Sequence, residues 1–202
     1  IGSKTEDYWK GIFVSSVARE KNKWMEGENI FDIALKLSKK PIDALFEIII
    51  DEKARAGAIF FSMSEGNLRK FLSLPYAMIG SDSSVRSFSG ITRSGKPHPR
   101  GFGSFPRFVG KYVRDDGLMP LSEAIRKMTS LPAETFGLKE RGFIREGFHA
   151  DIVIFDYEKI IDNATFKEPF KMASGINYVF VNGSLAFRNG EFTGSRSGRV
   201  LM

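Results

Sequence analysis

The sequence has no cysteine and no glutamine among its 202 residues, and it has only two histidines. Without cysteine the chain can form neither a disulfide framework nor a thiolate metal site. Two histidines without cysteine cannot supply the three or four nitrogen and sulfur ligands that zinc usually takes. Any metal must therefore be held by histidine, by carboxylates or by a modified residue.

The sequence also lacks long apolar runs and a secretory signal pattern. No stretch approaches the length of a membrane span, so we expect no membrane partner and a cytoplasmic protein. The net charge of +6 comes from lysines and arginines scattered along the chain. A nucleic-acid binder would gather them on one face, so we expect a solvated basic surface and no nucleic-acid partner. Abundant Lys and Glu with no Gln is a hyperthermophile trend, which predicts a hot-environment source.

The N-terminal part of the chain predicts one strand followed by two helices. Residues 12–17, Ile-Phe-Val-Ser-Ser-Val, favour a strand. Asn29 is typical of a helix N-cap, with Asp32 three residues later in the capping-box position. Pro41 suits the first turn of a second helix, and Gly57 is predicted to end it.

The next stretch predicts a strand, a helix and a second strand. Residues 58–63 show no polar alternation, as buried parallel strands do, and Ser64 would cap the helix that follows. A second strand is predicted at residues 76–80. Such a unit is right-handed and brings both strand ends to one edge of the sheet, where Met63 and Asp82 would lie together.

Asp82 is the leading catalytic candidate. A carboxylate at a strand end can accept a proton from a metal-bound water and pass it to a leaving group. Gly-Ser-Asp at residues 80–82 is also ordinary turn chemistry, so a turn-capping role stays open. Met63 would line a substrate pocket or belong to the core.

A long loop rich in Ser, Gly, Pro and Arg is predicted at residues 83–107 and would be functional or disordered. In it, His98 stands between two prolines that stiffen the backbone, so it could orient a substrate or hold an oxyanion. An exposed loop histidine is the alternative. Arg100 could pair with a substrate carboxylate, and Arg93 and Arg107 are equally available for that role.

The last part of the chain changes to a β-rich pattern. Residues 151–156 favour a strand, and apolar stretches flank Asn182-Gly183, the strongest short signal for a hairpin.

Several motifs, in this order, resemble the C-terminal half of N-acyl-D-amino-acid deacylases (D-aminoacylases) of the amidohydrolase superfamily. They lie at residues 61–65, 78–82, 98–100, 103–107, 126–129 and 150–156. The resemblance runs over nearly the whole chain, which makes it specific.

The resemblance implies an α/β fold: the C-terminal segment of a metal-dependent (β/α)₈ barrel with a helical insert, followed by part of a small β-sandwich. Residues 1–57 would be the insert, residues 58–140 the last βα units with the loop 83–107, and residues 141–202 the sandwich segment. It implies zinc-dependent hydrolysis of a linear amide, the N-acyl-D-amino acid. Asp82 would match the aspartate after the last barrel strand, and Met63 a residue of the substrate pocket.

The family's metal ligands lie on earlier barrel strands, and none of these strands is present here. Of the residues in this sequence, Asp82 is the possible metal ligand. We therefore expect a fragment that by itself neither binds zinc nor catalyses. Its partner would be the missing N-terminal half or a second copy. Two alternatives stay open: another amidohydrolase that opens cyclic amides, as dihydroorotases and hydantoinases do, or a non-catalytic module that needs an N-terminal partner.

Overall fold

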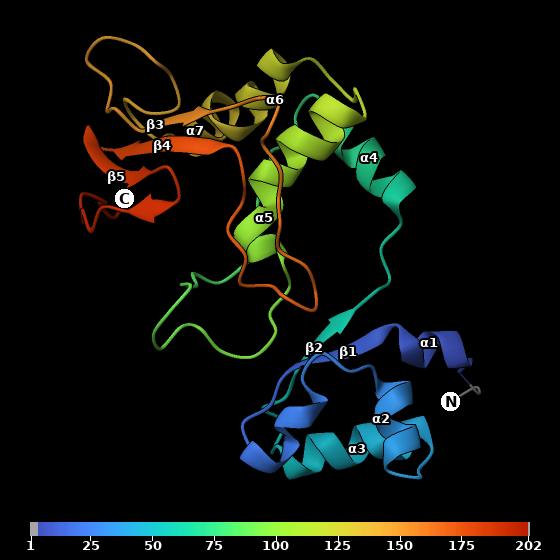
Figure 1. Cartoon of the computed structure of the whole chain (residues 1–202). Coiled ribbons are helices and arrows are strands. Elements are labelled where there is room, and N and C mark those ends of the chain that lie inside the picture. The colour runs from blue at the N-terminus through green and yellow to red at the C-terminus, as the bar shows by residue number, and fades with distance from the viewer. Residues whose placement is uncertain (1–3, 202) are drawn as a thin grey trace. The chain divides into compact units, whose positions relative to one another are not determined.

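The computed structural model describes residues 4–201, which divide into two units that are each built from separate stretches of the chain (Figure 1). Unit 1 comprises the described residues up to Ser64, together with Ser83–Gly101 and Thr165–Phe170. Unit 2 comprises Glu65–Asp82, Phe102–Ala164 and the described residues from Lys171 onward. The predicted boundaries after residues 57 and 140 stay predictions.

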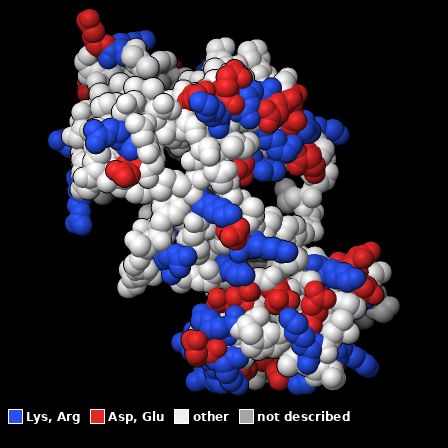
Figure 2. Space-filling model, in the orientation of Figure 1, with Lys and Arg blue, Asp and Glu red and all other residues white. Residues whose placement is uncertain are grey.

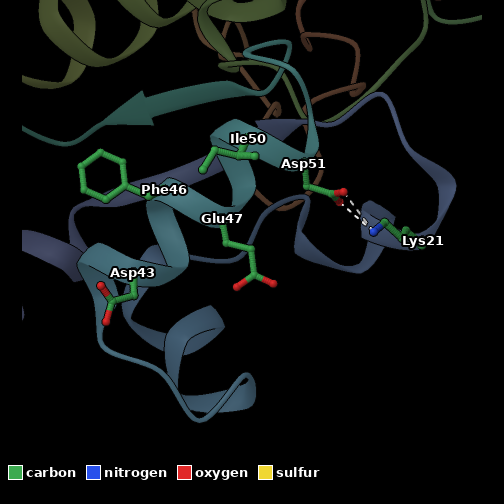
Figure 3. Close-up of a pocket in the computed structure, with 6 residues that line it drawn as sticks. All are labelled: Lys21, Asp43, Phe46, Glu47, Ile50 and Asp51. Carbon is green, nitrogen blue, oxygen red and sulfur yellow. Dashed lines mark hydrogen bonds and ion pairs between the residues drawn. The ribbon is translucent and has the colours of Figure 1, made fainter.

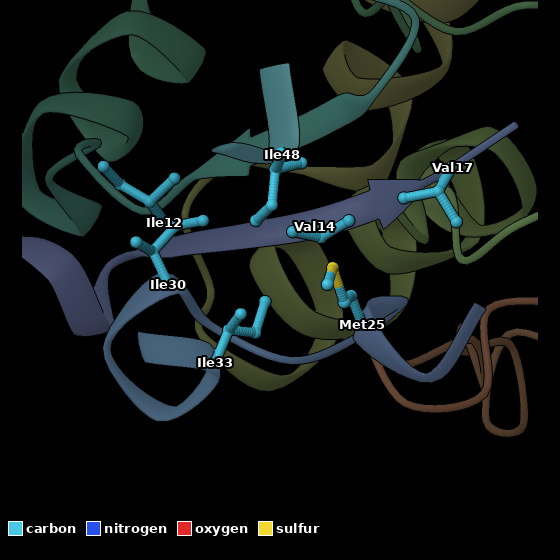
Figure 4. Close-up of a cluster of buried hydrophobic side chains, with 7 residues drawn as sticks. All are labelled: Ile12, Val14, Val17, Met25, Ile30, Ile33 and Ile48. Atoms are coloured by element: carbon cyan, nitrogen blue, oxygen red, sulfur yellow. The ribbon is translucent and has the colours of Figure 1, made fainter. Parts of the chain in front are cut away.

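Unit 1 is a small helical layer on a two-stranded sheet. Its elements are α1 (Glu6–Lys10), β1 (Ile12–Ser16), the 3-10 helix η1 (Glu20–Met25), α2 (Ile30–Lys36), α3 (Pro41–Asp51) and β2 (Gly57–Phe60). β1 and β2 pair in antiparallel fashion, with Ile12 opposite Phe60. Seven buried apolar side chains form the core between the sheet and the helices (Figure 4): Ile12, Val14, Val17, Met25, Ile30, Ile33 and Ile48.

Local capping chemistry sets the helix starts in unit 1 as predicted. The side chain of Asn29 accepts a hydrogen bond from the backbone N–H of Asp32 at 2.8 Å, which satisfies a donor at the start of α2. Pro41 is the first residue of α3, where its missing N–H costs nothing.

Two predictions for unit 1 are wrong. Gly57 does not end a helix, because α3 stops at Asp51 and the chain then turns through left-handed backbone at Lys53 and Ala54. Gly57 instead opens β2, where a Cβ would lie 2.6 Å from two serine hydroxyls of β1. The apolar stretch 58–63 is not a buried parallel strand. β2 ends at Phe60, runs antiparallel to β1 and alternates between half-buried and exposed, because β1 is its one partner among the described residues.

Unit 2 combines helices with a four-stranded antiparallel sheet. The helices are α4 (Glu65–Ser73), α5 (Arg100–Arg107), the π-helical stretch η2 (Phe108–Asp115), α6 (Leu121–Met128) and α7 (Ser130–Thr135). The first two residues of α5 are grouped with unit 1. The strands are β3 (Ile152–Phe155), β4 (Ile176–Val181), β5 (Ser184–Arg188) and β6 (Glu191–Phe192), in that order across the sheet. Phe108, Tyr112, Val113 and Ala124 form a buried cluster.

The predicted hairpin is confirmed. Asn182 and Gly183 have φ of 47° and 80° and connect β4 to β5 as a tight turn with both residues left-handed. Asn189 and Gly190 repeat this conformation between β5 and β6.

Two predictions for the middle of the chain are wrong. Residues 76–80 form no strand: Tyr76 lies in a turn, and the backbone of Ala77 and Ile79 bonds to Lys127 of helix α6 instead of a neighbouring strand. The irregular segment after Asp82 is also shorter than predicted, since α5 already begins at Arg100.

The surface and the helix lengths give two further observations. On the face drawn in Figure 2, lysines and arginines lie among aspartates and glutamates on both units. Several of them are paired, as Lys23 with Glu26 at 2.8 Å and Lys111 with Asp116 at 3.0 Å. Within residues 4–201, every helix is too short or too polar to cross a bilayer.

Candidate active site

Asp82 is the last residue of the unit 2 segment that follows α4. Its backbone is left-handed, with φ of 45°, and the residue is exposed. Aspartate tolerates this conformation better than most residues, but the conformation still costs free energy. Contacts of the neighbouring residues therefore have to stabilise it. Three residues earlier, the backbone N–H of Ile79 donates to the carbonyl oxygen of Lys127 at 3.3 Å. The side chain of Ile79 packs on the buried cluster of unit 2.

His98 is fixed by its own loop in unit 1. Its Nδ1 atom accepts a hydrogen bond from the backbone N–H of Arg100 at 3.0 Å. Burial, and then the charge of Arg100, hold the pKa of His98 below its ordinary value. The ring is therefore neutral near pH 7, with its proton on Nε2. His98 thus presents one N–H donor, as an oxyanion or carbonyl ligand would require.

A series of aromatic ring contacts, which we call the aromatic chain, connects His98 through Phe166 and Phe61 to Phe13. The ring of Phe166 meets the ring of His98 edge-on at 4.9 Å between centroids, and packs on Phe61 at 4.5 Å. Phe61 in turn contacts Phe13 of β1 at 5.1 Å. Phe166 was not among the predicted site residues, because it stands far along the chain in a segment without any distinctive motif.

Met63 is 79% exposed and belongs to unit 1, as do His98 and Arg100. Of the two alternative arginines, Arg93 lies over the ring of Phe170 at 4.9 Å.

Arg107, the second alternative, pairs with Asp162 at 3.3 Å. Both alternative arginines thus have partners within their own units. Asp82 belongs to unit 2, so its place in one site with Met63, His98 and Arg100 stays a prediction.

A metal site needs several donor side chains gathered around one point. Across residues 4–201, no group of three or more His, Asp or Glu side chains is gathered so that it could hold a metal. The two histidines belong to different units, and His149 lies 4.0 Å from the carboxylate of Glu140. The described residues therefore do not fit a complete zinc site.

A shallow depression in unit 1 includes none of the predicted site residues in its lining (Figure 3). It has a volume of about 450 Å³ and is lined by Lys21, Asp43, Phe46, Glu47, Ile50 and Asp51. Asp51 is already bound by Asn22 and Lys21, whose hydrogen bonds lower the pKa of its carboxyl group. This carboxylate is therefore engaged in holding η1 to α3.

The family follows from comparison with known proteins. The model of the amidohydrolase family matches residues 51–187, and the chain belongs to this family. The D-aminoacylase of Alcaligenes xylosoxydans xylosoxydans is 40% identical to it over 177 residues, which cover 88% of this chain and 34% of that protein. The chain thus spans about a third of the length of this relative.

Solved structures agree with this assignment. A D-aminoacylase crystal structure superposes with a TM-score of 0.81 at 38% identity, covering 94% of this chain and 37% of the other. The N-acyl-D-glutamate deacylase of Bordetella bronchiseptica, solved with zinc and a phosphonate inhibitor, superposes with a TM-score of 0.79 at 35% identity. That match covers 92% of this chain and 36% of the deacylase. The predicted resemblance is confirmed.

Proposed function

We propose that this chain is the C-terminal part of a zinc-dependent amidohydrolase that hydrolyses N-acyl-D-amino acids to a carboxylate and a D-amino acid. The observation that carries the proposal is the similarity to a D-aminoacylase structure over 94% of the chain at 38% identity. At this identity, and with the motifs around Asp82 in the same order, shared chemistry is a stronger explanation than a shared fold alone.

In the proposed reaction, Asp82 is the general base and then the general acid. Its carboxylate takes a proton from the water that attacks the acyl carbon, and it delivers that proton to the amine nitrogen as the C–N bond breaks. His98 donates a hydrogen bond from Nε2–H to the substrate and keeps its proton, an arrangement supported by the hydrogen bond from the backbone N–H of Arg100 to Nδ1. Arg100 pairs with the substrate carboxylate, and Met63 lines the pocket.

The finer architecture belongs to the same proposal. Residues 1–57 are the insert, residues 58–140 the last barrel units and residues 141–202 the sandwich segment of a complete (β/α)₈ enzyme. Zinc is held there by donors outside this chain, with Asp82 as the one ligand this chain could contribute. A cytoplasmic location and a thermophilic source stay predictions from the sequence.

A chimera tests the proposal. This chain replaces the matching third of the Alcaligenes D-aminoacylase, and hydrolysis of N-acetyl-D-methionine, N-acetyl-L-methionine and a hydantoin is measured with zinc present. We expect activity on the D-amide alone. Hydrolysis of the hydantoin instead would favour the cyclic-amide alternative.

The role of Asp82 is tested in the same chimera. Asp82→Ala should lower kcat by about 100-fold or more while the zinc content and the thermal unfolding stay unchanged. Asp82→Glu is the matched control that keeps the charge but moves it. A near-normal kcat for Asp82→Ala would exclude the acid–base role.

A further inference from the structure

The segment that leads to Asp82 lies against the C-terminal end of helix α6. Lys127 of that helix is 1% exposed, so its ammonium group is buried. Its Nζ atom donates to the carbonyl oxygen of Leu74 and to that of Ala77, the latter at 3.2 Å. A buried ammonium is costly unless it is well hydrogen-bonded, and here main-chain oxygens of one segment serve that need.

Arg126, the residue before it, holds the same segment from a more exposed position. Its Nη2 atom donates to the carbonyl oxygen of Pro75 at 2.6 Å. The guanidinium is itself oriented by Glu123, one helical turn earlier, through two hydrogen bonds of 2.7 and 2.8 Å. Pro75 lies between Leu74 and Ala77, the two residues that Lys127 binds. The side chains of α6 therefore donate hydrogen bonds to three carbonyl oxygens of this segment.

The main chain of α6 adds a fourth contact, because the carbonyl oxygen of Lys127 accepts from Ile79 at 3.3 Å. These contacts replace the ladder of hydrogen bonds that a strand would have provided for residues 76–80. Only two residues separate Ile79, the last of these contacts, from Asp82, whose left-handed backbone has to be held by the preceding chain.

We propose that Lys127, with Arg126, is a positioning residue for Asp82: it fixes residues 74–79 so that the carboxylate is presented in one orientation. The catalytic part of this inference rests on the proposed function, whereas the structural part does not. The burial that lowers the pKa of Lys127 agrees with a tightly enclosed contact.

Hydrogen–deuterium exchange of the full chain tests the structural part. Lys127→Met keeps the length of the side chain and removes its donors, so amides of residues 76–82 should exchange at least tenfold faster. The strands β4 and β5 of the same unit should keep their protection. Lys127→Arg should restore most of the protection, and Lys139→Met, at an exposed position, should change nothing.

Arg126→Met provides a second, milder variant in case Lys127→Met fails to fold. It removes the Pro75 contact and the pairing with Glu123 but leaves both hydrogen bonds of Lys127 in place, so it should accelerate exchange in residues 76–82 by a smaller factor. Unchanged exchange there, or equal acceleration across all of unit 2, would overturn the inference.

The chimera described above tests the catalytic part. Lys127→Met should lower kcat about tenfold and leave KM within twofold, because substrate contacts are untouched and Asp82 is displaced. Lys127→Arg should recover kcat. A rise in KM as large as the fall in kcat would overturn the positioning role. A chimera that is inactive with Lys127 in place would refute the proposed function instead, while the exchange experiment still decides the structural part.

Discussion

Replacing Gly110 by alanine should destabilise unit 2. Gly110 is buried in η2, where the backbone of Ile160 and the side chain of Ile161 approach it closely. An added Cβ would lie 2.2 Å from the carbonyl oxygen of Ile160 and 2.9 Å from Cδ1 of Ile161. The nearer clash is with backbone, so a change of rotamer cannot relieve it. The same carbonyl accepts a hydrogen bond from Arg114 at 2.8 Å, which would be displaced with it.

The expected cost follows from two opposing terms. Overpacking against a backbone atom costs about 3 kcal/mol at the upper end of the usual range. Alanine regains about 1 kcal/mol over glycine from helix propensity. The net loss is therefore about 2 kcal/mol, which moves the urea midpoint down by about 1 M for a typical m value.

Urea unfolding followed by far-UV circular dichroism measures this shift. Gly198→Ala is the matched control, since a Cβ there meets nothing within 4 Å and its φ is not left-handed. It should leave the midpoint unchanged. If Gly110→Ala unfolds at the same urea concentration as the control, the close approach of η2 to residues 160–161 is wrong.

Two further predictions concern unit 1. Asn29→Ala should lower the free energy of unfolding of unit 1 by about 1 kcal/mol, because helix α2 loses its N-cap. Asn29→Ser is the control, since serine can also cap the helix. Urea unfolding followed by tryptophan fluorescence reports this, because both tryptophans lie in unit 1. For His98, an NMR titration should give a midpoint below the ordinary value, and Phe166→Ala should raise it by exposing the ring. As the pH falls from about 6.5, the unfolded chain binds a proton that folded His98 does not, so stability decreases until the folded pKa is passed. His98→Asn should remove that part of the pH dependence; an unaltered dependence would contradict it.

The parts of the fold that depend on neighbouring residues could be predicted from the sequence. The Asn29 cap and the Asn182-Gly183 turn depend on side-chain and backbone chemistry within a few residues, and both are confirmed. The prediction of a strand at residues 76–80 was wrong, because an apolar segment becomes a strand only where another strand pairs with it. Its actual partners on α6 stand some 50 residues away, as the hydrogen bond from Lys127 to Ala77 shows.

The candidate site divides in the same way. Asp82 and His98 could be selected as candidates from their positions after an apolar stretch and between two prolines. Two contacting residues could not be selected: Lys127, which bonds to Ala77 in the segment before Asp82, and Phe166, which packs on His98. Neither has a local signal that distinguishes it from a surface lysine or a core aromatic residue.

The discontinuous composition of unit 1 has a consequence for how the chain is synthesised. The segment Thr165–Phe170 belongs to unit 1, and its Phe166 completes the aromatic chain behind His98. The N-terminal residues emerge from the ribosome long before this segment does. Unit 1 therefore cannot complete its folding until most of unit 2 has been synthesised. During that interval the rings of Phe61 and His98 lack their contact with Phe166. Nascent chains that stall before residue 165 should therefore be recognised by chaperones that bind exposed aromatic surface.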